Sequence, residues 1–413
     1  MGKDLYEIGE LPPVGEVPAR MHAQLVRPER FGEPSVAIQD EVIDVPEIGP
    51  HEALVAVMAA GVNFNNVWAA RGIPVDVTKG QARWGEPTDF HIVGSDASGI
   101  VWAVGSEVKN VQVGDRVVVH AGQWNLDDPH VLAGADPGLA ASFRVWGYDT
   151  CWGSFSQFTK VQAHQCLPKA DFLTWEEAAA PTLTGATAYR MLHGWPPHTV
   201  EPGDVVLVWG GSGGLGSLAV QLVKEAGGRA VAVVSSKEKG EYATSLGAVG
   251  YVNRRDFDHW GVPPAWDSPD WKAWSQGAKA FGKAIWDVLG EKRSPRIVFE
   301  HPGQDTIPTS NFVCDRGGMI VICAGTSGYD TMIDVRYLWY MQKRYQGSHL
   351  FNDQQAEAFN DLVIEGKIQT TLGTAYRYEQ TGEVHQLMGD GKLPEGNVAV
   401  LVDAPTEGLK DLP

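Results

Sequence analysis

Cysteine is scarce in this sequence, and its spacing excludes two kinds of cross-linked protein. The chain of 413 residues has four cysteines, Cys151, Cys166, Cys314 and Cys323, which lie far apart without a C-x-x-C pair. This pattern argues against a disulfide framework and against a structural zinc site made of cysteines. Reduced thiols of this kind are typical of a cytoplasmic protein.

Positive charge and long apolar runs are also missing. Lys and Arg total 33 against 51 Asp and Glu, so the formal net charge is −18. Because nucleic acid would be repelled by this charge, we expect no nucleic-acid partner. The segment 1–7 has no apolar signal region, and no stretch approaches the roughly 18 apolar residues of a membrane span. We therefore expect a cytoplasmic protein without a membrane partner.

The sequence does contain a glycine-rich stretch around which the rest is organised. Val205–Trp209 is an aliphatic run typical of a strand, residues 210–216 hold five glycines, and residues 217–223 read as a helix. Gly211, Gly213 and Gly216 fit G-x-G-x-x-G between strand and helix, which predicts a dinucleotide site. The predicted pyrophosphate-binding residues are Gly211, Ser212, Gly213, Gly214, Leu215 and Gly216.

The end of the next predicted strand indicates which dinucleotide is bound. An NAD site carries Asp or Glu here for the ribose 2′-OH. This chain instead has Ser235, Ser236 and Lys237, which suit the 2′-phosphate of NADPH. The alternative is that Lys237 and Lys239 are solvated residues at a helix start and that the cofactor is NADH.

The chain divides into regions of different pattern. Short alternating runs separated by Pro and Gly fill residues 21–57 and continue to about 119, which is typical of small antiparallel sheets. Thr174 and Glu177 form a capping signature that opens a helix. From Asp204 to Gly347 strands and helices alternate, as in a doubly wound parallel sheet. After Gly347 a β run at residues 399–402 predicts a return to the first domain.

An insertion at residues 256–294 is unusually rich in tryptophan. It holds Trp260, Trp266, Trp271, Trp274 and Trp286, too many large apolar groups for a solvated loop. An oligomer contact is one use of such a patch, and a local core is the other.

The combination of a β domain, a dinucleotide domain and a C-terminal return resembles the medium-chain dehydrogenase/reductase superfamily. The resemblance implies an α/β protein with a GroES-like β-rich catalytic domain that includes an N-terminal arm (1–185), a Rossmann cofactor domain (186–347) and a return segment to the catalytic domain (348–413). Zinc members of that superfamily carry Gly-His-Glu where this chain has Gly94-Ser95-Asp96, and a four-cysteine lobe that is missing here. We therefore expect no metal.

Finer motifs resemble the crotonyl-CoA carboxylase/reductase family over nearly the whole chain. They lie at residues 62–68, 90–99, 146–150, 188–192, 298–303, 336–339, 346–349 and 396–402. The resemblance implies that NADPH gives hydride to the β-carbon of an enoyl-CoA and that the resulting enolate attacks CO2. Crotonyl-CoA would give ethylmalonyl-CoA, and the family is a homotetramer, a dimer of dimers.

The resemblance also implies catalytic residues. Asn65 matches the amide that anchors CO2, with a turn-capping Asn as its alternative, and His349 matches the histidine that holds a water. Tyr148 matches an aromatic residue that shields CO2. Asp149 stands where the family has Glu. Because Asp is one methylene shorter, its carboxylate lies roughly 1.5 Å further back than that of Glu. Protonation of the enolate would then give butyryl-CoA, so a non-carboxylating enoyl-CoA reductase remains an alternative, and a redox-silent NADPH-binding protein is a further one.

For the CoA end, Arg336 and Tyr337 match the family's substrate motif. Arg336 would clamp phosphate, since guanidinium geometry favours bidentate contacts. Lys343 and Arg344 follow closely and predict a local basic cluster, with exposed charges on a helix face as the alternative.

Overall fold

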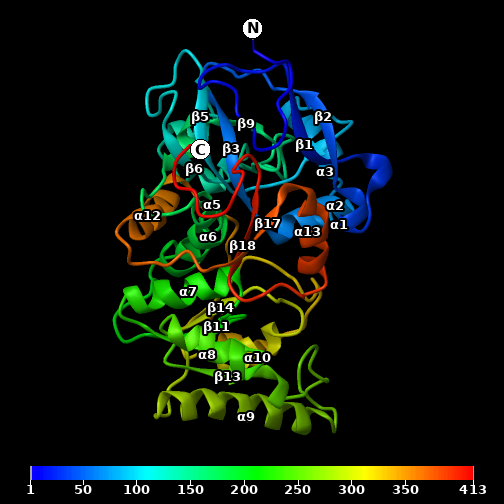
Figure 1. The fold of residues 1–413 in the computed structure, drawn as a ribbon. Helices are drawn as coiled ribbons and strands as arrows, with labels where there is room; N and C mark the ends of the chain where they lie inside the picture. The colour runs from blue at the N-terminus through cyan, green and yellow to red at the C-terminus, as the bar shows by residue number, and fades with distance from the viewer. Residues whose placement is uncertain (1, 413) are drawn as a thin grey trace. The chain divides into compact units, whose positions relative to one another are not determined.

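The computed structural model describes residues 2–412, and the chain forms two compact units (Figure 1). Of the described residues, unit 1 comprises 2–183, 350–366 and 370–412, and unit 2 comprises 184–349 and 367–369. Helix α6 (Thr182–His193) contains the boundary between them along the chain. Among the described residues, no helix combines the length and apolar character that a membrane crossing requires.

Unit 1 is built on mostly antiparallel sheets. The largest has the strand order β10-β6-β5-β3-β18-β17 with β9 also paired to β3, a second has the order β2-β1-β4, and β7 pairs with β8. The strands are β1 (Arg20–Val26), β2 (Gln39–Asp44), β3 (Glu52–Gly61), β4 (His91–Ile92), β5 (Ala97–Val104), β6 (Arg116–Val119), β7 (Gly122–Gln123), β8 (Arg144–Val145), β9 (Phe158–Gln162), β10 (Cys166–Pro168), β17 (Leu372–Arg377) and β18 (Asn397–Leu401). Strand β18, near the C-terminal end of the chain, pairs with β3.

Strand β3 is the centre of unit 1 because both of its faces are buried. Val55 and Val57 enter one apolar cluster, whereas Leu54, Ala56 and Met58 enter another. This alternation follows from the two-residue period of a strand.

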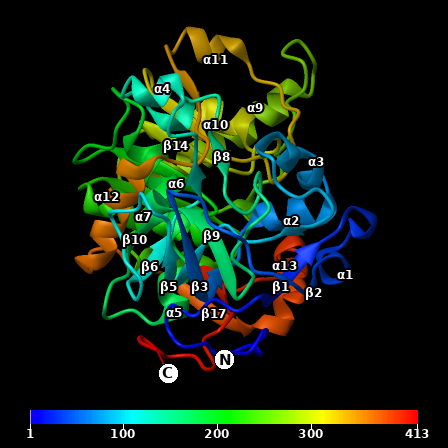
Figure 2. The same cartoon turned by 90° about the horizontal axis from the view of Figure 1, so that it is seen from above.

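Three helices of unit 1 pack together. Helices α1, α2 and α13 lie together beside β1 and β2 (Figure 2). The predicted capping box at Thr174 and Glu177 is confirmed at the start of α5. Residues 37–38, expected in a strand, instead end a short helix that Pro34 begins, because proline suits a first helical position. The helices are α1 (Pro34–Ala37), α2 (Phe64–Arg71), α3 (Val77–Gln81), α4 (Pro129–Leu132), α5 (Trp175–Ala179), α12 (Asp353–Ile364) and α13 (Thr381–Gly389), with 3-10 turns at Pro28–Arg30, Ala82–Trp84, Pro137–Leu139, Ala163–Gln165 and Tyr378–Gln380.

Unit 2 is a doubly wound parallel sheet. Its strand order is β13-β12-β11-β14-β15-β16, the arrangement of dinucleotide-binding domains. The strands are β11 (Val205–Trp209), β12 (Arg229–Val234), β13 (Gly250–Asn253), β14 (Ile297–Glu300), β15 (Met319–Ile322) and β16 (Arg344–Gly347). The helices are α7 (Gly214–Glu225), α8 (Lys237–Ser245), α9 (Trp271–Leu289), α10 (Ile307–Val313) and α11 (Val335–Trp339), with a 3-10 turn at Arg254–Asp256. The α/β fold class predicted from the sequence is confirmed.

The tryptophan-rich insertion contributes to the core of unit 2. It carries α9, which lies beside β13 (Figure 1). Trp274 is buried, and Trp260 packs against Trp209 and Phe281. Trp266, in contrast, is 67% exposed. The local-core interpretation therefore holds for part of the insertion, and Trp266 remains as an exposed apolar group.

Candidate active site

The glycine loop of unit 2 is shaped for close approach of an anion. A Cβ on Gly216 would lie 2.2 Å from the Gly210 carbonyl oxygen, and one on Gly211 would lie 2.7 Å from Ala232 Cβ. Only glycine fits at these two places. The N-cap of α7 is Gly213, which has no side chain to bond the first helix amides, so their N–H groups and the helix dipole are available to phosphate.

A histidine from the motif at residues 298–303 packs against this loop. A Cβ on Gly210 would lie 2.4 Å from His301 Nε2, and that nitrogen is 3.2 Å from the Trp209 carbonyl oxygen. Burial lowers the pKa of His301 to about 4, so the ring is neutral at pH 7. His301 therefore braces the loop without adding charge.

Beyond β12 the chain offers hydroxyls and one lysine. Ser236 caps α8, accepting a hydrogen bond from the Lys239 N–H at 3.3 Å, and Ser235 precedes it. Lys237 is largely exposed, and its Nζ lies 3.4 Å from Glu241 Oε1. Such surface pairs contribute only about 0.3–0.5 kcal/mol, so a 2′-phosphate can replace Glu241 at little cost.

In unit 1, the first turn of α2 is bound to three consecutive residues. The Gly94 N–H donates to Asn66 Oδ1 at 3.1 Å, and Asn65 Nδ2 donates to Ser95 Oγ at 2.7 Å. Asn63 Nδ2 donates to Asp96 Oδ2 at 2.9 Å. Asn65 Oδ1 is buried and has no hydrogen-bond partner among residues 2–412. Asn63 has the structural position at the helix N-cap, whereas the Oδ1 of Asn65 stays buried without a partner among residues 2–412.

Residues 94–96 do not fit a catalytic zinc. Ser95 and Asp96, which replace His and Glu, are both fully buried, and each is engaged by an asparagine. Asp96 Oδ1 also accepts the Leu183 N–H at 2.8 Å. Burial raises the pKa of Asp96 well above its usual range, and hydrogen bonds only partly offset this. A serine hydroxyl and one buried carboxyl are a poor ligand set for zinc.

The turn carrying Tyr148 and Asp149 meets the same segment. Gly147 has φ +69°, and a Cβ there would lie 1.7 Å from the Gly94 carbonyl oxygen, so the two backbones are in close contact. His91 Nε2 lies 3.2 Å from the Gly147 carbonyl oxygen. Unit 1 thus brings Asn65 and the turn at residues 145–149 to one short stretch of chain, residues 94–96.

Asp149 uses its carboxylate within the turn. Its Oδ2 accepts the Val145 N–H at 2.7 Å, and its own N–H donates to the Val145 carbonyl at 2.8 Å. Tyr148 is half-buried against the apolar cluster that includes Trp146. The Asp149 carboxylate therefore stabilises the turn at residues 145–149. The sequence did not reveal this role.

His349 belongs to unit 2 and lies two residues beyond β16. It is exposed, and the preceding Ser348 is fixed by its N–H to Ile322 at 2.8 Å and by Trp195 Nε1 at 3.2 Å. The backbone that carries His349 is thus anchored to the sheet.

The predicted CoA residues lie in unit 2 but do not form a free basic cluster. Arg336 makes a bidentate contact with Asp334 and stacks 5.4 and 5.6 Å from the rings of Trp266 and Trp271. Tyr337 packs on Phe312. Lys343 is buried and donates to the Asn311 carbonyl at 2.5 Å. Arg344 lies in β16 rather than on a helix, and it binds the carbonyls of Trp195 and Pro196.

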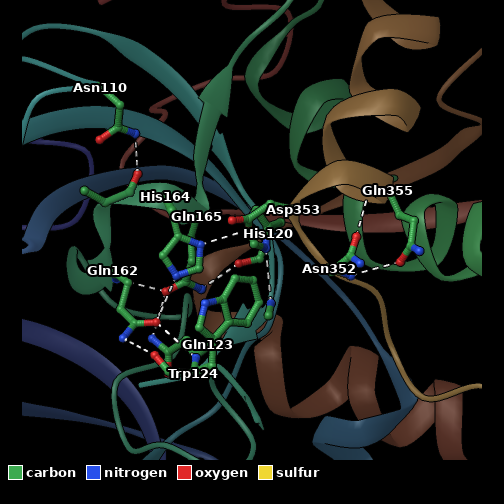
Figure 3. Close-up of polar contacts among 12 residues, drawn as sticks. Asn110, His120, Gln123, Trp124, Gln162, His164, Gln165, Asn352, Asp353 and Gln355 are labelled. Carbon is green, nitrogen blue, oxygen red and sulfur yellow. Dashed lines mark hydrogen bonds and ion pairs between the residues drawn. The ribbon is translucent and has the colours of Figure 1, made fainter. Parts of the chain in front are cut away.

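One polar cluster in unit 1 was not foreseen from the sequence (Figure 3). His120 Nε2 and His164 Nδ1 each lie 2.9 Å from Asp353 Oδ1, and these side chains are the one His/Cys/Asp/Glu group within residues 2–412 close enough to share an ion. However, His120 Nδ1 accepts the Gly122 N–H at 3.2 Å. Neutral His120 then carries its proton on Nε2, the nitrogen a metal would need, so the group fits a hydrogen-bonded network better than a metal site.

This cluster should stabilise unit 1 through Asp353. Burial alone would raise the pKa of Asp353, but His120 and His164 lower it well below its usual range. Asp353→Asn should destabilise the protein by about 1–3 kcal/mol at pH 7, since the hydrogen bond with His164 Nδ1 is then made to a neutral amide instead of a charged carboxylate. A depressed folded pKa means that the stabilisation is complete above the unfolded pKa of about 4 and fades as the pH falls further. Thermal unfolding of both proteins at pH 7 and near pH 3 checks this, and an equal difference at both pH values would contradict it.

The comparisons with known proteins agree with this architecture. The alcohol dehydrogenase GroES-like domain model matches residues 49–171, and the zinc-binding dehydrogenase model matches residues 214–365. Together with the parallel sheet of unit 2, these matches define a medium-chain dehydrogenase/reductase whose residues do not fit the catalytic zinc.

Full-length relatives then define the family. The crotonyl-CoA carboxylase/reductase of Cereibacter sphaeroides is 50% identical over 408 residues, covering 99% of this chain and 94% of the relative. The crotonyl-CoA reductase of Streptomyces collinus is 40% identical, covering 92% and 85%. The solved structure of crotonyl-CoA carboxylase/reductase AntE in complex with NADP is 52% identical with a TM-score of 0.94, covering 98% and 100%. The chain belongs to the crotonyl-CoA carboxylase/reductase family.

Proposed function

We propose that this protein catalyses the NADPH-dependent reductive carboxylation of a short-chain enoyl-CoA, fixing CO2. NADPH, when bound, supplies a hydride to the β-carbon of crotonyl-CoA. The electron pair released into the thioester enolate forms a bond from the α-carbon to CO2, and ethylmalonyl-CoA and NADP⁺ leave. The names of the relatives, the NADP in the AntE structure and the glycine loop support this proposal.

The observation that carries the proposal is the half-engaged amide of Asn65. CO2 has no net charge or dipole and must be held by a few fixed donors beside the enolate. Asn65 is fixed by Ser95 at one end, while its other end finds no partner within residues 2–412. The end without a partner is the acceptor Oδ1, so the amide has to turn before Nδ2 can donate to CO2. A donor placed in this way would stabilise the carboxylate as it develops. Tyr148 would shield the CO2, and His349 would hold a water.

We assign Gly211, Ser212, Gly213, Gly214, Leu215 and Gly216 to the pyrophosphate, and Ser235, Ser236 and Lys237 to the 2′-phosphate. Lys237→Ala should raise the KM for NADPH by about 10- to 100-fold, the effect of a hydrogen bond to a charged group, and leave the KM for NADH unchanged. Steady-state kinetics with both cofactors tests this, with exposed Lys272→Ala as the control. A parallel loss with NADH would show that Lys237 does not bind the 2′-phosphate.

We assign Arg336 and Tyr337 to binding of CoA. A phosphate of CoA would replace the Asp334 carboxylate as the partner of the Arg336 guanidinium. Lys343 and Arg344 would act by holding this segment, because their donors are already used by backbone carbonyls. We further propose a cytoplasmic homotetramer, a dimer of dimers, as the family resemblance implies; the exposed Trp266 is compatible with such contacts.

Asp149 favours a second candidate function, plain reduction of crotonyl-CoA or acrylyl-CoA. Its carboxylate is bound to the Val145 N–H and is short for ordering a water near CO2. Asp149→Glu should therefore raise the ratio of ethylmalonyl-CoA to butyryl-CoA. A ratio equal to that of the wild type would show that Asp149 does not cause the formation of butyryl-CoA.

The test of the function is NADPH oxidation with crotonyl-CoA, with and without bicarbonate and carbonic anhydrase, followed by mass spectrometry of the products. Faster oxidation with CO2 and mainly ethylmalonyl-CoA are expected. Mainly butyryl-CoA at saturating CO2 would favour the reductase, and no oxidation with any enoyl-CoA would leave a redox-silent NADPH-binding protein.

A further inference from the structure

In the orientation that the structure shows, the Asn65 amide directs its donor Nδ2 to Ser95 and does not offer this donor to CO2. Its Nδ2 faces Ser95 Oγ, and the end that finds no partner among residues 2–412 is the oxygen Oδ1. A buried carbonyl oxygen without a partner costs about 1–3 kcal/mol. The oxygens of CO2 and of the carboxylate it becomes are acceptors, so they cannot satisfy Oδ1.

Rotation of the amide by 180° exchanges its two ends. Nδ2 then occupies the position of the unpaired oxygen, from which it would donate to a CO2 oxygen, and Oδ1 faces Ser95. In that orientation the residue at position 95 has to donate a hydrogen bond, whereas in the first orientation it accepts one. A serine hydroxyl can do either, since it carries one donor and two acceptor lone pairs.

The surroundings of Ser95 hold it in place for this task. Ser95 is fully buried, and both neighbours are bound to the same turn, Gly94 to Asn66 and Asp96 to Asn63. The Ser95 Oγ therefore stays within reach of the Asn65 amide while its hydrogen turns about the C–O bond.

We propose that Ser95 is a positioning residue for carboxylation, whose hydroxyl donates to Asn65 Oδ1 and so directs Asn65 Nδ2 toward CO2. This assignment rests on the proposed function and adds the residue that selects the working face of the amide. In this assignment Ser95 acts through Asn65, its side-chain hydrogen-bond partner, so it should affect the fate of the enolate rather than its formation.

The test compares Ser95→Ala, Ser95→Thr and a matched control. The control is Ser98→Ala, three residues after Ser95. It removes another fully buried serine hydroxyl, which donates to the Trp175 carbonyl at 2.6 Å. Each protein is assayed for the ratio of ethylmalonyl-CoA to butyryl-CoA, for the KM for CO2, and for kcat of NADPH oxidation without CO2. Melting temperatures show whether each variant is folded.

Ser95→Ala should lower the ratio by about 3- to 10-fold, the effect of one neutral hydrogen bond, and raise the KM for CO2, with kcat without CO2 little changed. Ser95→Thr, which keeps the hydroxyl, should restore the ratio, and Ser98→Ala should leave it unchanged. A wild-type ratio in Ser95→Ala, or equal ratios in the Ala and Thr variants, would overturn the proposal. Butyryl-CoA alone from the wild type would instead overturn the proposed function, and this assignment with it.

Discussion

Asn65→Leu should turn a carboxylase into a reductase. Leucine has a similar volume but no donor, so hydride transfer to crotonyl-CoA continues while CO2 loses its anchor. Removing a preorganised donor of this type typically costs about 100- to 1,000-fold. We expect the ratio of ethylmalonyl-CoA to butyryl-CoA to fall by that factor, and NADPH oxidation without CO2 to change little.

The matched control for this substitution is Asn110→Leu. Asn110 Nδ2 donates to the Ala163 carbonyl at 2.8 Å, so the change also removes one amide hydrogen bond from unit 1. The control should keep the wild-type product ratio. If Asn65→Leu still yields mainly ethylmalonyl-CoA, CO2 is held elsewhere and Asn65 is only a residue of the helix start.

Gly216→Ala should abolish NADPH binding. Its Cβ would lie 2.2 Å from the Gly210 carbonyl oxygen, which is backbone and cannot move aside without opening the loop. We expect the Kd for NADPH to rise at least about 100-fold, since helix and strand need close contact to present the amides to the pyrophosphate. Fluorescence titration with NADPH measures this.

Gly282→Ala is the control for the glycine loop. Gly282 lies within α9, and its Cβ would meet Val313 at an ordinary 3.6 Å. Alanine there should leave NADPH binding intact and favour the helix by up to about 1 kcal/mol. Wild-type NADPH affinity in Gly216→Ala would show that the loop is not the cofactor site.

The fold was largely accessible from the sequence because its strongest signals are local. The glycine fingerprint, the aliphatic run at Val205–Trp209 and the box at Thr174 each reflect interactions within a few residues. Strand β16 was missed because Arg344–Gly347 is short, polar and at the edge of the sheet, where no alternation of buried residues marks it. Residues 37–38 lie among short alternating runs that predict strands, whereas the structure has Ala37 as the last residue of the short helix α1.

The site was less accessible because its partners are distant along the chain. Ser95 stood in a recognised motif, but the sequence presented it only as a missing zinc ligand, and its contact with Asn65 spans 30 residues. His164 and Asp353 meet across 189 residues, with no spacing that would suggest it. The sequence shows that Asp149 is one methylene shorter than Glu. It does not show that the carboxylate accepts the Val145 N–H, because this contact depends on the backbone geometry of the turn.

The most direct test of the central claim follows the enolate itself. The wild-type enzyme is given crotonyl-CoA and NADPH in D2O with ¹³C-bicarbonate and carbonic anhydrase, and the products are analysed early by mass spectrometry. Capture by CO2 gives ethylmalonyl-CoA with one ¹³C, and protonation gives butyryl-CoA with one deuterium at the α-carbon. We predict mainly the ¹³C product; deuterated butyryl-CoA as the main product at saturating CO2 would contradict the assignment of Asn65 and of this protein as a carboxylase.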